Sequence, residues 1–156
     1  MGWVSLTLRK LSLRNEMNSR ELRDIQISRE IRGVERNLSY QQSIFNRQKK
    51  RELADAKVEY LQAREERPED IKSQEYSEWQ AEYAIAKEDF EAAKTNIEEY
   101  YNEILEEIEQ EATDEETEKQ EEQTSLEAQL ESIRAEFDSV KEQISSDIEN
   151  SKLNFS

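Results

Sequence analysis

YSEWQAEYAIAKEDFEAAKTNIEEYYNEI, residues 76–104, is the stretch that decides the fold of this chain. Its apolar residues recur at alternating spacings of three and four, at Tyr76, Trp79, Tyr83, Ala86, Phe90, Ala93, Ile97, Tyr100 and Ile104. This alternation is the seam of a coiled-coil helix, which faces a partner helix along its length. Aromatic residues share the seam with alanines, and large residues facing small ones suit close antiparallel packing. The stretch therefore predicts a long helix packed lengthwise against another.

The composition of all 156 residues fits long helices better than a compact globule. Charged residues make up 38% and hydrophobic residues 34% of the chain, whereas soluble domains are typically about 25% charged and about 45–50% apolar. Such a composition leaves two classes, which are disorder and helices that bury a narrow stripe. Two glycines and one proline are too few for a disordered linker or a β-rich fold. We therefore expect an all-α protein.

A similar seam runs through the preceding residues 19–67. It is carried by Ile27, Ile31, Val34, Leu38 and Phe45 and, after a step of eight, resumes at Leu53. A step of eight shifts the seam by one residue and locally changes the winding of a coiled coil. Pro68 follows, and a proline with acidic residues behind it favours the first turn of a new helix. The two seams predict an antiparallel hairpin of residues 19–67 and 70–111, within a domain 19–111 that turns at Pro68.

An acidic stretch follows the expected hairpin. Residues 112–123 carry many carboxylates and no clear apolar stripe. Two capping boxes, which begin at Thr113 and Thr124, are typical of helix starts. We therefore expect an acidic connection over 112–123 and a third helix with a tail over 124–156.

The N-terminal residues 1–18 are compatible with two structures, an extended apolar arm and a short helix. Asn18 and Glu21 match a further capping box, which predicts a break before the hairpin. The complete expectation is an elongated antiparallel coiled-coil hairpin plus a third acidic helix. Its expected core consists of Ile27, Ile31, Val34, Leu38, Phe45, Trp79, Tyr83, Phe90, Ile97, Ile104, Leu130, Phe137 and Ile144.

Charge is distributed unevenly along the chain. Residues 1–67 hold 15 Lys and Arg against 10 Asp and Glu, an excess of five positive charges, and residues 68–156 hold 7 against 28, an excess of 21 negative charges. The two helices of the hairpin are therefore expected to attract each other, although each exposed ion pair contributes only about 0–1 kcal/mol. The net charge of −16 repels nucleic acid and disfavours it as a partner.

The chain lacks the residues on which most catalytic and metal sites depend. It contains no cysteine and no histidine, which removes the commonest general base and the commonest transition-metal ligands. The sequence also shows no glycine-rich phosphate loop and no pairing of a nucleophile with a base. We therefore expect no enzymatic activity, no cofactor, no metal and no small-molecule substrate. The expected partners are other protein subunits, in a homo-oligomeric or hetero-oligomeric assembly.

Two apolar ends and one basic patch are the candidate partner-binding sites. Large apolar residues at a chain end often anchor a protein in its neighbour. A run of basic residues can contact phosphates, although here it also fits a solvated helix face or an ion pair with the acidic helix. The candidates are Trp3, Val4, Leu6, Leu8, Leu11 and Leu13 at the start, Arg47, Lys49, Lys50 and Arg51 in the patch, and Leu153 and Phe155 at the end. For the apolar residues at the start, the competing interpretation is an end cap of the helical bundle itself.

The opening residues Met1 to Lys10, MGWVSLTLRK, followed by a long charged helix, resemble small helical virion proteins of tailed bacteriophages. The resemblance covers about the first tenth of the chain, and it implies a structural, non-enzymatic role in a head, neck or internal-protein layer. The expected function is thus a structural or adaptor subunit of a larger assembly, with a bacteriophage virion as the candidate. The size and hairpin shape also resemble the export-stalk proteins of flagella and injectisomes, although strong acidity and a third helix fit that family poorly. The alternative function is therefore an acidic coiled-coil chaperone or regulator that binds a basic protein.

The N-terminal apolar cluster is too short for a signal peptide or a membrane span, because Arg9 and Lys10 interrupt it. We expect synthesis in the cytoplasm, no secretion by a signal peptide and no membrane partner, with a virion as the candidate final location.

Overall fold

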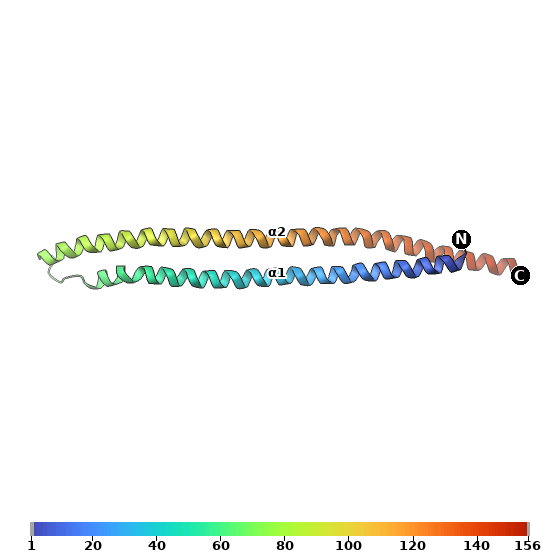
Figure 1. Ribbon diagram of the computed structural model, residues 1–156, viewed down its shortest axis with the longest axis horizontal. Coiled ribbons are helices and arrows are strands. Elements are labelled where there is room, and N and C mark those ends of the chain that lie inside the picture. The colour runs from blue at the N-terminus through green and yellow to red at the C-terminus, as the bar shows by residue number, and fades with distance from the viewer. Residues whose placement is uncertain (1, 156) are drawn as a thin grey trace. The chain divides into compact units, whose positions relative to one another are not determined.

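The computed structural model describes residues 2–155, with side chains described for residues 2–152. Helix α1 spans Trp3–Glu65 and helix α2 spans Gln74–Phe155. The two helices pack in opposite directions as an antiparallel hairpin (Figure 1), which confirms the all-α class and the hairpin. No helix within residues 2–155 combines the length and apolar character that crossing a lipid bilayer requires.

The hairpin divides into two compact units. The terminal unit consists of Met1–Val34 and Thr113–Ser156, and the turn unit consists of Glu35–Ala112. Each unit contains one stretch of α1 and one stretch of α2, so each packs its own pair of antiparallel helices.

The terminal unit has an aliphatic core. Leu6, Leu13, Ile133 and Val140 are buried together, and Met17, Phe137 and Ile144 pack against them. Ile27, Leu126 and Leu130 are also buried in this unit. Polar pairs flank the core from both helices: Arg9 lies 2.7 Å from Glu136, and Arg134 lies 3.0 Å from Glu21. These pairs agree with the expected attraction between the helices, although their side chains are about half exposed and contribute little stability.

The turn unit has an aromatic core instead. Tyr60 of α1 lies between Tyr83 and Phe90 of α2, with ring centroids 5.6 Å and 5.4 Å away. Trp79 stacks on Tyr83 at 5.1 Å. Such ring pairs contribute about 0.5–1.5 kcal/mol beyond the area that they bury. The expected core residues of this unit are half-buried, because two helices alone cover only one side of each of these side chains.

The expected third helix is wrong, because α2 continues through residues 112–123 without interruption and already contains its residues. The hydroxyls of Thr113 and Thr124 do not cap new helices there. The hydroxyls of Thr117 and Thr124 instead donate to the carbonyl oxygens of Thr113 and Gln120, at 2.8 Å and 3.0 Å. Each acceptor lies four residues earlier in the same helix, so these bonds form within a continuous helix. The stretch lacks glycine and proline, and its glutamates and alanine favour helix.

The expected break before residue 19 is also wrong. Helix α1 already begins at Trp3 and passes through Asn18 without a cap. The N-terminal residues form a helix rather than an extended arm, and this helix is continuous with the hairpin. Leu6, Leu13 and Met17 explain this, because they continue the core-facing pattern of α1.

The second helix starts later than Pro68 predicts, at Gln74 rather than residue 70. Ser73 provides the cap, since its Oγ accepts a hydrogen bond from the Tyr76 amide at 3.1 Å. Asp70 shapes the turn before it, because its carboxylate accepts from the Lys72 amide at 3.0 Å and its carbonyl accepts from the Ser73 hydroxyl at 2.8 Å. The serine cap, rather than the proline, sets the start of α2.

The prediction that Tyr100 belongs to the seam is wrong, because Tyr100 is 59% exposed whereas Tyr101 is 3% exposed. From Ile97 the seam steps by four to Tyr101, so it shifts by one residue. The facing part of α1 shifts similarly, since Lys49 is half-buried between Phe45 and Leu53. Lys49 Nζ donates to Asn102 Oδ1 at 3.4 Å, so the two shifts meet. The step of eight in the sequence is thus two steps of four around a half-buried lysine.

Candidate interaction surface

The six apolar residues at the start of α1 divide between two faces of the helix. Leu6 and Leu13 are 6% and 0% exposed and belong to the core of the terminal unit. Trp3, Val4, Leu8 and Leu11 are between 49% and 64% exposed. The structure therefore assigns two of the predicted binding residues to the hairpin's own packing and leaves four at the surface.

The exposed residues belong to a longer row, which we call the outer stripe. It follows alternating spacings of four and three, and it consists of Val4, Leu8, Leu11, Asn15, Asn18, Leu22 and Ile25. Each stripe residue lies two positions before a core-facing residue such as Leu6 or Leu13, which is about 200° around an α-helix. The stripe therefore faces away from α2. Its five apolar members are between 51% and 65% exposed.

Sequence reasoning missed Leu22 and Ile25 as members of this surface. Both continue the spacing that begins at Val4, and Leu22 and Ile25 are 65% and 52% exposed. The signal was present, but two asparagines interrupt the apolar run and hide its continuity. Isolated exposed apolar residues are ordinary, whereas a row of them on one helix face marks a contact surface.

The basic patch is partly used by the hairpin itself. Arg47, Lys50 and Arg51 are exposed, as expected for a surface that contacts a partner. Lys49 is half-buried and donates to Asn102 of α2. The structure thus leaves three of the four predicted cations on the surface. The side chains of Leu153 and Phe155, the predicted binding residues at the other end, lie outside the described residues.

A polar layer crosses the core of the terminal unit next to Ile27. Gln123 Nε2 donates to Ser28 Oγ at 2.9 Å and to the Asp24 carbonyl oxygen at 3.4 Å. Asp24 Oδ1 is buried and accepts no hydrogen bond within the described part of the chain. Polar residues in a helical seam cost stability but fix which residues face each other. Sequence reasoning missed this layer because Gln123 had been placed in a connection.

An ion-pair network lies beside the polar layer. Glu30 accepts from Lys119 at 3.0 Å and from Arg23 at 3.2 Å, and Arg23 also donates to Glu122 at 2.9 Å. The hydrogen bonds from Lys119 and Arg23 lower the pKa of the Glu30 carboxyl. The network joins both helices within the terminal unit and provides charge complementarity in addition to the polar layer.

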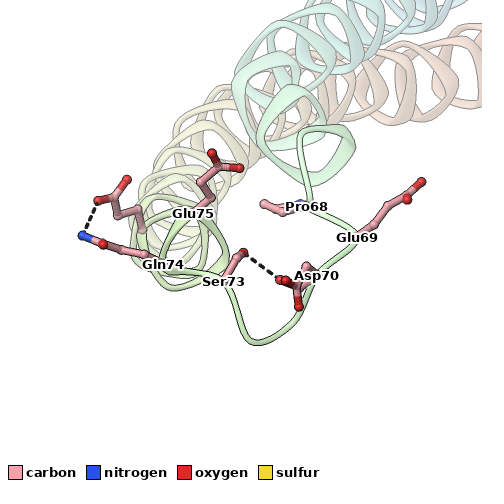
Figure 2. A pocket seen from close by; sticks show the side chains of 7 residues that line it. Pro68, Glu69, Asp70, Ser73, Gln74 and Glu75 are labelled. Carbon is pink, nitrogen blue, oxygen red and sulfur yellow. Dashed lines mark hydrogen bonds between the residues drawn. The ribbon is translucent and has the colours of Figure 1, made fainter.

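The turn end carries an acidic depression rather than a binding pocket with converging groups. Figure 2 shows its lining, with Pro68, Glu69 and Asp70 in the turn and Gln74 and Glu75 at the start of α2. Within the described residues, no cluster of acidic side chains is arranged to hold a metal ion. The depression is open to solvent. The polar side chains that line it therefore stay in contact with water, unlike those of a typical ligand-binding pocket.

The aromatic residues behind the turn stabilise the hairpin. The indole N–H of Trp79 donates to the carbonyl oxygen of Ala63, one of the last-turn carbonyls that a helix leaves without a partner. The guanidinium of Arg67 lies 5.8 Å from the Tyr76 ring centroid and 6.0 Å from that of Trp79. A hydrogen bond with Tyr60 raises the pKa of Tyr83, and burial raises that of Tyr101. These contacts explain the aromatic seam by packing.

Fold and surfaces together define an all-α, two-helix hairpin with an apolar stripe on the outer side of α1. No known protein family matches the sequence, no curated protein resembles it closely enough to count as a relative, and no solved structure matches the fold.

Proposed function

We propose that this chain is a non-enzymatic structural or adaptor subunit that packs through helical seams into a larger assembly. The outer stripe carries this proposal. It places five large apolar side chains, each more than half exposed, in one row on a helix that has already buried its other face. Helix pairs gain most of their stability from packing apolar faces, and a stripe of this kind is stabilised when a further helix covers it.

The virion of a tailed bacteriophage is the assembly that we propose, on the resemblance of residues 1–10 to virion proteins. The exposed Trp3 at the start of α1 supports the proposal, since it extends the apolar surface to the first turn of the helix. Aromatic residues of this kind are enriched among the anchors of protein interfaces.

A second candidate function is that of an acidic chaperone or regulator of a basic protein. The excess of 21 negative charges on residues 68–156 favours it. Binding through an acidic surface weakens steeply as salt rises, whereas binding through an apolar stripe persists. Salt therefore separates the two functions.

The test is sedimentation of the tagged chain from the cells that naturally make it. We expect it to sediment with a large particle in both 0.1 M and about 1 M NaCl. Leu22→Glu should release the chain into the slow fraction, because it puts a charge into the stripe. Ile85→Glu is the matched control, since Ile85 is 61% exposed on α2, close to the 65% of Leu22. Sedimentation only as a small species would overturn the proposal, and release by salt alone would favour the acidic binder.

A further inference from the structure

The outer stripe has a symmetric order of residue types. Reading inward from Leu8 and from Ile25, Leu8 matches Ile25, Leu11 matches Leu22, and Asn15 matches Asn18. Within these six positions, the stripe therefore has the same character when read in either direction. A helix face of this kind is complementary to itself when a second copy lies against it in the opposite direction. That is the arrangement of a two-fold, isologous interface, in which the same patch serves both subunits.

Antiparallel pairing places each of these six residues opposite one of its own kind. Leu8 and Leu11 of one copy then face Ile25 and Leu22 of the other, and the asparagines meet in the middle. Each asparagine side chain has both donors and an acceptor, so facing amides can hydrogen-bond each other. A buried asparagine in a helical seam is a device that specifies register and partner number at a cost in stability. The stripe thus carries both the apolar contacts and the register signal of an interface.

Charge favours the antiparallel over the parallel arrangement. The four-three spacing of the stripe continues beyond Ile25 to Arg29 and Arg32, both exposed. A parallel, in-register pair would stack these arginines on their own copies just beyond the C-terminal end of the stripe, where like charges repel. The antiparallel pair instead brings Arg29 opposite Val4 at the end of the stripe. It also brings Arg14, at the edge of the stripe, near Glu21 of the other copy.

Charge also favours α1 over α2 as the contact between copies. Residues 1–34 hold 7 Lys and Arg against 4 Asp and Glu, whereas residues 113–156 hold 4 against 13. Two copies that met through α2 would bring two strongly acidic surfaces together. Contact through the outer stripe keeps those surfaces apart, because the stripe faces away from α2.

We propose that two copies of this chain associate through the outer stripes of their α1 helices, antiparallel and around a two-fold axis. The inference rests on the proposed function, since it names the first partner in that assembly. Leu11 and Leu22 form the central apolar contacts, and Asn15 and Asn18 set the register.

Light scattering of the purified chain after size-exclusion chromatography tests the association. We expect twice the mass of one chain for the wild type and a single-chain mass for the double variant Leu11→Glu with Leu22→Glu. Both leucines are exposed in the hairpin, at 51% and 65%, so helix content by circular dichroism should stay unchanged. Ile85→Glu is again the control and should remain dimeric. A monomeric wild type, or a dimer that the double variant leaves intact, would overturn the proposal.

Disulfide trapping tests the direction of pairing independently. The chain contains no cysteine, so introduced thiols react without background. An equimolar mixture of Leu8→Cys and Ile25→Cys chains should form a covalent dimer under mild oxidation, whereas each variant alone should not. In the antiparallel pair, two copies of position 8 lie about 25 Å apart at about 1.5 Å per residue, far beyond the roughly 7 Å limit between Cα atoms in a disulfide. Rapid cross-linking of Leu8→Cys alone would indicate parallel pairing and overturn the proposal.

The two proposals can fail separately. A chain that is monomeric when pure, yet sediments with a large particle through the stripe, would refute the two-fold pair and leave the structural function standing. A chain that forms the antiparallel pair but never joins a larger particle would do the reverse.

Discussion

Gly33 lies in the interior of α1 without any visible need for a glycine. An added Cβ would meet nothing within 4 Å, and no glycine in residues 2–155 has a positive φ. Glycine in a helix interior costs about 1 kcal/mol relative to alanine. We therefore expect Gly33→Ala to raise the free energy of unfolding by about 0.5–1 kcal/mol in urea titrations.

Gly2 provides the matched control, because it also has open space around an added Cβ. It precedes α1, and its carbonyl oxygen accepts from the Leu6 amide at 3.3 Å, as an N-cap residue does. Glycine is a better N-cap than alanine, so Gly2→Ala should leave stability unchanged or slightly lower. Loss of stability in Gly33→Ala would contradict this prediction and would show that residue 33 is closely packed.

Continuity of α2 is the feature that most changes the expected architecture, and a proline substitution tests it. Glu115 is exposed and lies within the stretch that the sequence assigned to a connection. Inside a helix, proline removes a backbone hydrogen bond and costs about 3 kcal/mol or more. We expect Glu115→Pro to lose about this much stability in urea unfolding, and Glu115→Ala to change it by less than about 0.5 kcal/mol.

A tolerated proline at residue 115 would contradict the continuous helix and favour the connection. The two variants share a position and remove the same charge, so their difference reports the backbone alone.

Sequence periodicity predicted the helices where the half-buried positions hold apolar residues at regular spacings of three and four. The seam from Tyr76 to Ile97 is one such stretch, and the structure confirms it. Between Ile104 and Leu126 the core-facing positions include Ala112, Lys119 and Gln123, at steps of mostly four. That spacing approaches an eleven-residue repeat, which differs from the seven-residue repeat of a left-handed coiled coil. A search for a strict apolar heptad therefore cannot detect that the helix continues through this stretch.

The faces of α1 near the N-terminus show a different limit of sequence reasoning. Leu6 and Leu13 are seven residues apart, and Val4, Leu8 and Leu11 follow four-three spacing, so both sets fit a helical seam. Which set packs inward depends on Ile133 and Val140 of α2, more than 100 residues away. The sequence could therefore name the cluster as a whole but could not separate core from surface.

At the scale of the whole molecule, the net charge of −16 sets the balance between attraction and repulsion. The ion pairs between the helices are partly exposed, and such pairs contribute about 0–1 kcal/mol each. The excess of negative charge on residues 68–156 opposes them, because like charges disfavour a folded state that gathers them. Salt screens both the attraction and the repulsion, with a Debye length of about 10 Å at 0.1 M and about 3 Å at 1 M. Whichever of the two is larger decides whether added salt raises or lowers the stability of the hairpin.

We expect repulsion to be the larger effect, so that salt stabilises the hairpin. The Tm measured at one fixed protein concentration should rise on the order of 5 °C between 20 mM and 500 mM NaCl. The double charge reversal Glu107→Lys with Glu118→Lys, at two exposed positions of α2, lowers the magnitude of the net charge by four. It should raise the Tm at low salt and reduce the response to salt. If the Tm falls as salt rises, ion pairs such as Arg9–Glu136 and Lys119–Glu30 outweigh the repulsion, and the charge asymmetry between the helices then stabilises the fold rather than opposing it.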